Sequence, residues 1–230
     1  MDKDTLHEAL IKIYNKDGIS SLDKACWDML ELFERSAKFN DNYRELKGEV
    51  AETYLQCCLT ELQKIIQPSI VLKSLCIPFI TSGSTTELDL TLVTDRVIYL
   101  FECKSYMGGK SITDKCLIDG KMDVYAQSVL HCKALNQHLS QFYLHGKDYK
   151  PYKLILFEMS RKPLVDNRLD NWKSMIPVLN PKTFFSGFQS IHSCYPSNVW
   201  DLKAMYPTLN KLNSNSAKYF QQHMQRFKER

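Results

Sequence analysis

The sequence predicts an α/β fold in which a mixed central β-sheet lies between helices. The apolar pattern changes along the chain from helical spacing to β-branched runs and back, in the order helix, strand, hairpin, helix, strand. Residues 152–159 are almost continuously apolar, which is typical of a strand buried on both faces of a sheet. With 230 residues, of which 44% are hydrophobic, the chain is long enough for one large domain with helical additions.

We expect three parts along the chain. Residues 1–42 form an N-terminal helical addition, with one helix over 5–14 and a second that Ser20 or Ser21 caps and that runs to about Phe39. Residues 43–180 form the core. Residues 181–230 form a C-terminal extension of aromatic-rich loops, with helices near 199–206 and 216–227.

The core elements follow from apolar periodicity and from glycine and proline positions. Apolar spacing predicts a helix over 43–66, which ends before Pro68. A strand is predicted over 70–80, with an interruption at Pro78. The remaining predicted elements are a hairpin of 86–94 with 97–103, a helix over 122–144, a strand over 152–159 and an edge strand over 175–179, where Pro177 disfavours a central position.

The hairpin carries acids inside an otherwise apolar run. Its strands are separated by the two polar residues Asp95-Arg96, and a two-residue loop fixes the register of the flanking strands. Counting back from this turn places Leu90 opposite Phe101 and Asp89 opposite Glu102. Directly opposed residues have Cβ atoms roughly 4.5–5.5 Å apart, so two carboxylates at these positions could share one cation.

Lys104 follows Glu102 by two residues and therefore points to the same face of the strand. Unpaired opposed carboxylates destabilise a buried hairpin, and a metal ion removes that cost. Hard oxygen ligands with few protein carboxylates favour Mg²⁺. The alternative is that Asp89 and Glu102 are solvated at the end of the sheet and that Lys104 pairs with one of them, since so short a pattern also arises by chance.

Other residues join these in a recognisable order. Gly48-Glu-Val-Ala-Glu52 lies on the first core helix, Ser105-Tyr-Met-Gly108 follows Lys104, and Gln127 lies on the later helix. Over about 47–158 this pattern resembles the nuclease-related domain (NERD) family of the PD-(D/E)xK nuclease superfamily, whose motifs are G-x-x-G-E, Asp, E-x-K and a helical Gln. Ala51 replaces the second glycine and Leu88 replaces the proline before the aspartate. The resemblance implies a restriction-endonuclease-like core.

The helix acid is chosen on a helical wheel, on which each residue advances by about 100°. Glu52 lies at the margin of the apolar face and Glu49 nearly opposite, so we choose Glu52 and keep Glu49 as the second candidate. An ordinary solvated acid beside the core is the alternative for Glu52. Gln127 shares a stripe with Leu130, His131 and Ala134, and a buried glutamine bonded to backbone is the alternative there.

The resemblance implies a Mg²⁺-dependent nuclease that hydrolyses phosphodiester bonds, in DNA ahead of RNA, with Mn²⁺ expected to substitute. The implied catalytic residues are Glu52, Asp89, Glu102, Lys104 and Gln127. The implied metal ligands are Asp89, Glu102, the backbone carbonyl of Cys103, and Glu52. Lys104 would orient or deprotonate the attacking water or stabilise the developing charge, and the last role is favoured because two carboxylates keep a lysine protonated. A non-catalytic nucleic-acid-binding or protein-interaction module that retains the fold is the alternative.

Composition limits the setting. The eight cysteines lie mostly in apolar runs without a C-x-x-C pair, which indicates free thiols in a reducing, cytoplasmic compartment. Neither a secretory leader nor a membrane span is expected, and no membrane partner. The histidines, including His131 and His138, read as surface or satisfied core residues. Net charge is only +4, although basic residues cluster after Lys104 and around 147–162. The oligomeric state stays open, a homodimer included.

Overall fold

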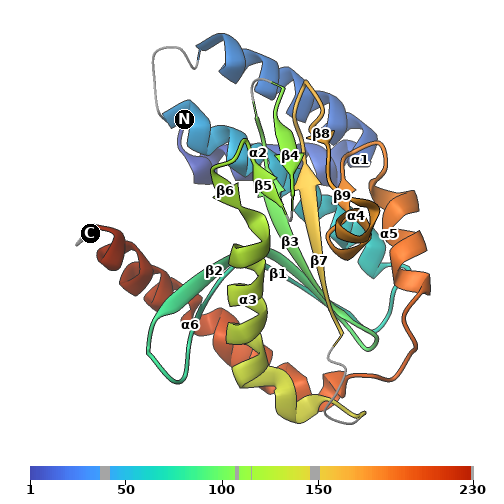
Figure 1. Cartoon of the computed structure of the whole chain (residues 1–230). Helices are drawn as coiled ribbons and strands as arrows, with labels where there is room; N and C mark the ends of the chain where they lie inside the picture. Colours follow the sequence, from blue (N-terminus) through green and yellow to red (C-terminus); the bar gives the residue numbers. More distant parts are fainter. Residues whose placement is uncertain (37–41, 107–108, 115, 146–150, 229–230) are drawn as a thin grey trace.

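The computed structural model describes residues 1–36, 42–106, 109–114, 116–145 and 151–228, and its centre is a mixed five-stranded sheet (Figure 1). The strand order is β1-β2-β3-β7-β9, with β1 antiparallel to β2, β2 antiparallel to β3, and β3, β7 and β9 parallel. The strands are β1 Ser69–Pro78, β2 Thr85–Thr94, β3 Ile98–Lys104, β7 Tyr152–Glu158 and β9 Val178–Leu179. The predicted mixed sheet is confirmed, and β9 is an edge strand, as the proline before it indicated.

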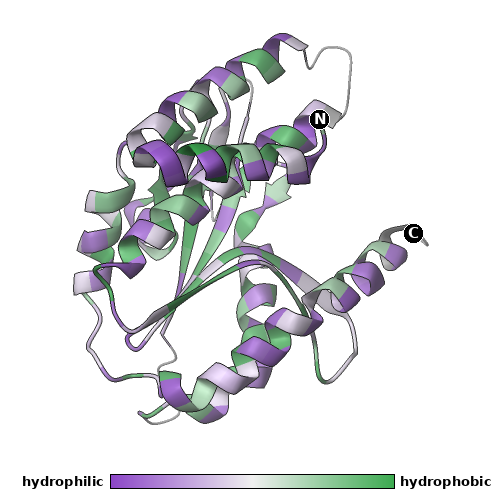
Figure 2. Ribbon diagram, turned by 180° about the vertical axis from the view of Figure 1, so that it is seen from behind, coloured by the Kyte–Doolittle hydropathy of each residue, from purple (hydrophilic) through white to green (hydrophobic). Residues whose placement is uncertain are grey.

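One face of the sheet is covered by α1 (Lys3–Ser36), α2 (Asn42–Gln63) and α5 (Phe184–Ser193). Seen from behind, α1 and α2 cross this face, and the strands beneath are mostly apolar (Figure 2). The two predicted N-terminal helices are joined as α1 across a kink at Gly18, whose φ of 79° suits glycine. Buried residues of α1 and α2 belong to one cluster with those of β3 and α5, so α1 is part of the main core.

The other face is covered by α3 (Val124–Leu139) and α6 (Leu202–Lys228). α3 ends at Leu139, earlier than the predicted 144. At its N-terminus, Asp123 caps the helix by accepting a hydrogen bond from the Ala126 N–H at 2.8 Å. α6 runs through Pro207 near its start and so joins the two helices predicted at the C-terminus. It follows the long β1–β2 hairpin along its length (Figure 1).

A second, small sheet was not predicted. Its strands are β4 Ser111–Thr113, β5 Leu117–Ile118, β6 Met122–Asp123 and β8 Val165–Asp166, in the order β6-β5-β4-β8. Strands of two or three residues are too short to show a period. The structure also has a 3₁₀ turn at Ser140–Phe142, a helix α4 at Asp170–Met175, and α5 where loops were expected.

All eight cysteines are free thiols, and six of them are buried, as the sequence indicated. Among the described residues, no helix is both long enough and apolar enough to cross a membrane. Met107, Gly108, Lys115, Lys147 and Lys150, which the sequence placed in a glycine-containing loop or in basic clusters, lie outside the described residues.

Candidate functional site

The predicted register of the β2–β3 hairpin is confirmed. Backbone pairing runs from Val93 opposite Ile98 to Leu90 opposite Phe101 and then stops. One residue further, Asp89 Oδ2 accepts a hydrogen bond of 2.8 Å from the backbone N–H of Cys103. A carboxylate therefore takes the place that a backbone carbonyl would have in a continued ladder, and the two strands part at this point.

The end of the ladder also frees a backbone acceptor. In a β-strand the N–H and C=O of one residue point to the same edge. Since the Cys103 N–H points toward β2, its carbonyl does too, on the side where the ladder has ended. The next residue, Lys104, has its carbonyl bonded on the other edge, to the Met159 N–H at 2.9 Å.

The opposite edge of β2 is irregular at the same level. The β1–β2 ladder skips Ser74, whose φ is 48°, a backbone conformation that non-glycine residues rarely adopt. Ser216 of α6 compensates with its hydroxyl, which donates to the Ser74 carbonyl at 2.9 Å and accepts from the Cys76 N–H at 2.8 Å. Asp89 thus lies where β2 loses regular pairing on both sides.

The two opposed acids are buried together. Burial raises the pKa of Asp89, and the negative charge of Glu102 raises it further, although Lys104 and the Cys103 N–H oppose this. Glu102 is 4% exposed. Its Oε1 accepts a short hydrogen bond from Lys104 Nζ, whereas its Oε2 is buried and has no partner among the described residues.

Lys104 keeps its proton. Burial by itself lowers the pKa of this ammonium, but the charges of Glu102 and Asp89 outweigh that effect and raise it. A protonated lysine is a donor and a positive charge, and it is unsuited to act as a base. Asp89, on the other strand, accepts its hydrogen bond from the Cys103 N–H and not from Lys104. The ammonium of Lys104 therefore lies beside two carboxyl groups, those of Glu102 and Asp89.

Glu52 approaches this group from α2. Burial raises its pKa first, followed by the charges of Asp89 and Glu49, so Glu52 and Asp89 are electrostatic neighbours. No hydrogen bond or ion pair of the Glu52 carboxyl occurs among the described residues.

Glu49 has different surroundings from those that the helical wheel indicated. It is 8% exposed, because α1 and β1 cover the side of α2 on which it lies. Its Oε1 accepts from Lys73 Nζ at 2.5 Å and from Thr53 Oγ1 at 2.9 Å, and lies 3.2 Å from His7 Nδ1. Glu49 therefore has a lysine, a threonine and a histidine as partners, none of which belongs to the group at the strand gap.

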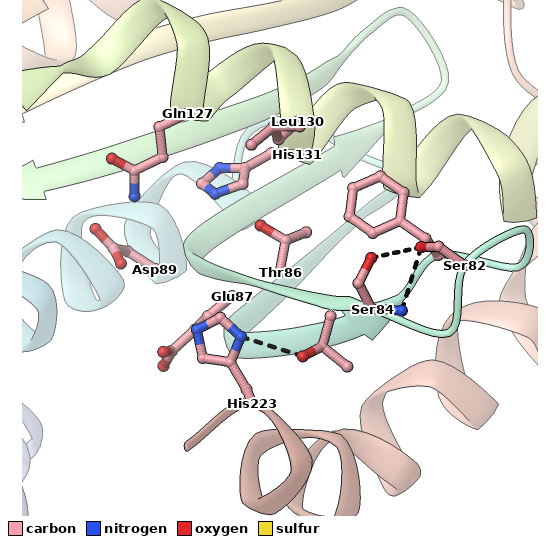
Figure 3. A pocket seen from close by; sticks show the side chains of 11 residues that line it. Ser82, Ser84, Thr86, Glu87, Asp89, Gln127, Leu130, His131 and His223 are labelled. Atoms are coloured by element: carbon pink, nitrogen blue, oxygen red, sulfur yellow. Dashed lines mark hydrogen bonds between the residues drawn. The ribbon is translucent and has the colours of Figure 1, made fainter. Parts of the chain in front are cut away.

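A groove of about 650 Å³ leads to Asp89 between the β1–β2 hairpin, α3 and α6. Gln127 and His131 of α3 lie in its wall, with the Gln127 amide directed toward Asp89 (Figure 3). Glu87 and His223 lie farther along it, and four hydroxyls of the hairpin line the rest (Ser82, Ser84, Thr85 and Thr86). No lysine or arginine is among the described lining residues.

His131 is a residue that sequence reasoning missed. Burial, and then the charge of Lys104, lowers its pKa to about 4, so it is a neutral imidazole beside the acids. The available signal was its spacing: it lies four residues after Gln127, one turn along the same face of α3.

The described residues include no group of three or more His, Cys, Asp or Glu side chains already spaced as a metal site. The donors nevertheless fit a hard divalent cation. Glu102 Oε2 is buried without a partner among the described residues, and the Cys103 carbonyl points toward the edge where the ladder has ended. The charge of Glu102 raises the pKa of Asp89, and the charge of Asp89 raises that of Glu52. A cation would remove the repulsion that raises the pKa values of Asp89 and Glu52.

Comparisons with known proteins bear on the same segment. The model of a family described as nuclease-related domain matches residues 47–158. No curated protein matches the chain. Among solved structures, the small subunit (R.BspD6I2) of the heterodimeric restriction endonuclease R.BspD6I is similar at 10% identity and a TM-score of 0.31, covering 87% of this chain and 98% of that one.

Proposed function

Residues 47–158 belong to the nuclease-related domain family, and from this premise we propose that the protein is a metal-dependent nuclease that hydrolyses phosphodiester bonds, in DNA ahead of RNA. One observation carries the proposal: Asp89 and Glu102 directly follow the last backbone pair of β2 and β3, beside Lys104, and one buried oxygen of Glu102 has no partner among the described residues. Such an arrangement lowers the stability of the folded protein. A ligand that binds these groups would explain why the chain retains them.

The residues that would hold Mg²⁺ or Mn²⁺ are Asp89, Glu102 and the carbonyl of Cys103, with Glu52 binding directly or through water. A bound divalent ion supplies Lewis acidity toward a phosphoryl oxygen and lowers the pKa of a coordinated water. The carboxyls of the chain would supply the negative charge that binds the ion, and Asp89 is held beside β3 by its hydrogen bond from the Cys103 N–H.

Lys104 acts as an electrostatic group. Its raised pKa keeps it protonated, and its short bond to Glu102 fixes the ammonium next to the acids. From there it can donate to a non-bridging phosphate oxygen or to the attacking water, and stabilise the charge that develops on the phosphorus centre. Gln127 and neutral His131 would orient the same phosphate or water from α3 as hydrogen-bonding groups.

The proposal is tested by incubating purified protein with plasmid DNA, single-stranded DNA and RNA in Mg²⁺, Mn²⁺ or EDTA. We expect cleavage in either metal, none in EDTA, and none with Glu102→Gln. Glu49→Gln is the matched control, because it removes the same charge from α2 outside the strand gap, and it should still cleave. Intact substrates in every metal condition, with wild-type protein folded, would instead assign the chain to the non-catalytic binding modules.

A further inference from the structure

A second cavity lies beyond the carboxyl ends of β7 and β9, on the other side of β3 from the groove. Its volume is about 370 Å³, which is within the range of small-molecule sites. Two prolines line it together with Trp27, Glu158, Ser160, Arg161, Asn180 and Lys182.

This cavity is joined directly to the candidate site. Glu158 pairs in register with Lys104, and the backbone N–H of Tyr106, two residues after Lys104, donates to Ser160 Oγ at 2.8 Å. Neighbouring strands lie about 4.8 Å apart, so the cavity begins roughly one strand spacing from Lys104. Ligands in α/β proteins commonly bind beyond the carboxyl ends of parallel strands, and β3, β7 and β9 are parallel.

Trp27 of α1 is the aromatic residue among those that line the cavity. Its indole is partly buried, and its Nε1 donates to Asp23 Oδ1 at 3.1 Å, which holds the ring on α1. A held indole is a stacking surface for any base, worth about 1–3 kcal/mol per stacked base.

Two cations lie beside this ring. The Arg161 side chain is 48% exposed, and among the described residues it has one ion pair, a long one of 3.4 Å between Nη1 and Glu34 Oε2. Its other donors have no hydrogen-bond acceptor there and face solvent. Lys182 is exposed, and its ammonium has no ion-pair partner among the described residues. The acid of the cavity, Glu158, is only 3% exposed, and burial raises its pKa. Its Oε1 is buried and has no hydrogen-bond partner among the described residues, whereas Arg161 and Lys182 are both exposed.

The groove at Asp89 and this cavity differ in charge, and the difference predicts which way the substrate strand runs from Lys104. The described lining of that groove has acids and no lysine or arginine, whereas this cavity has two cations and only a buried acid. A phosphate next to the one being cleaved is therefore attracted toward β7 and β9 and away from β2.

We propose that this cavity is a subsite for one nucleotide of the substrate strand, adjacent to the phosphodiester at Lys104. Trp27 stacks on the base, and Arg161 and Lys182 neutralise the neighbouring phosphate. The subsite rests on the proposed function, since a nuclease must hold the strand on both sides of the cleaved bond.

The test measures binding, separately from cleavage. A fluorescent single-stranded oligonucleotide is titrated with full-length protein in EDTA at several salt concentrations, and anisotropy gives the affinity. Trp27→Ala should weaken binding about 5- to 150-fold, and Trp27→Phe should recover most of it. Arg161→Ala and Lys182→Ala should each reduce the slope of log affinity against log salt by about 1. Lys203→Ala, an exposed lysine on α6, is the matched control and should leave the slope unchanged.

The outcomes separate the two proposals. If Trp27→Ala, Arg161→Ala and Lys182→Ala all bind within twofold of wild type with an unchanged salt slope, or if wild type binds no oligonucleotide, the subsite is wrong whether or not the protein cleaves DNA. If binding weakens as expected but no metal supports cleavage, the subsite stands and the nuclease activity falls. A melting-temperature measurement on each variant shows that Trp27→Ala remains folded. The two exposed cations test the subsite without that concern.

Discussion

Glu49 and Glu52 lie three residues apart on α2, yet the surroundings of their carboxylates are opposite. Glu49 has a lysine, a threonine hydroxyl and a histidine nitrogen within hydrogen-bond distance of one oxygen. Glu52 has no such partner among the described residues, and the groups that act on its charge most strongly are two more acids. The charge of Glu49 is neutralised by its partners, whereas the charge of Glu52 lies near further negative charges.

The Glu49 cluster contributes to the stability of the fold, whereas the cluster of Glu52, Asp89 and Glu102 lowers it. A buried charge is tolerated when it is paired and bonded, and it is costly otherwise. The Glu49 cluster meets that condition from within the chain. Among the described residues, the cluster of Glu52, Asp89 and Glu102 has one ion pair, from Lys104 to Glu102, and burial with neighbouring negative charge still raises the pKa values of Asp89 and Glu52. A cation from outside the chain would neutralise this charge.

Two lysines give the sharpest comparison. Lys104 and Lys73 are each bonded to a glutamate, and their side chains are 17% and 20% exposed. Lys104→Ala should lower the cleavage rate roughly 10²–10³-fold, because one preorganised electrostatic contact is lost, while metal binding is kept. Lys73→Ala should lower it by no more than the loss of folded protein. The rates are compared at saturating Mn²⁺, well below the melting temperature of each variant.

Metal binding gives the next comparison. A ligand that binds only the folded state stabilises it by about 2.7 kcal/mol when its concentration is a hundred times Kd. Wild-type protein should therefore melt at a higher temperature in Mn²⁺ than in EDTA. Asp89→Asn removes one of the repelling charges, so its melting temperature in EDTA should equal or exceed that of wild type, and its response to Mn²⁺ should shrink.

Glu49→Gln is the control for this experiment, and it should respond to Mn²⁺ as wild type does. If wild type and Asp89→Asn melt at the same temperature in both buffers, the carboxyls do not form a coupled metal site.

The sequence was sufficient to predict the hairpin because a two-residue turn fixes every opposed pair that follows it. It could not predict the burial of Glu49, since a helical wheel assumes one apolar face, whereas α2 is covered by the sheet on one side and by α1 on the other. The pairing of Glu49 with Lys73 depends on tertiary packing over 24 residues of sequence. His131 was missed for a related reason: burial and its proximity to Lys104, which the sequence does not give, are what distinguish it from an ordinary core histidine.

The third prediction concerns the stability of the Glu49 cluster. Lys73→Met preserves most of the side-chain volume but leaves the Glu49 carboxylate without its cation. Loss of a partner by a buried polar group costs about 1–3 kcal/mol, so the free energy of unfolding in urea should fall by that amount. The double variant Lys73→Met with Glu49→Gln should recover part of the loss, because the unpaired charge is gone. A single variant as stable as wild type would mean that this pair contributes nothing and that the contrast with Glu52 is misplaced.

The smallest effect is the pH dependence of the metal-free protein. Burial, followed by the charges of Asp89 and Glu49, raises the pKa of Glu52 above its ordinary value of 4.5. A carboxyl with a higher pKa in the folded state binds its proton more tightly when folded, so its contribution to the free energy of unfolding falls as pH rises from that ordinary value to the raised one. In EDTA, Glu52→Gln should therefore match wild type at about pH 5 and be the more stable protein at about pH 8.

His131, whose lowered pKa acts in the opposite direction, is present in both proteins and cancels in the difference. Glu45→Gln, at an exposed acid in the first turn of α2, should show no such pH-dependent gain. A stability difference between Glu52→Gln and wild type that is the same at both pH values would show that Glu52 does not share the buried field of Asp89, and Glu52 would then leave the site.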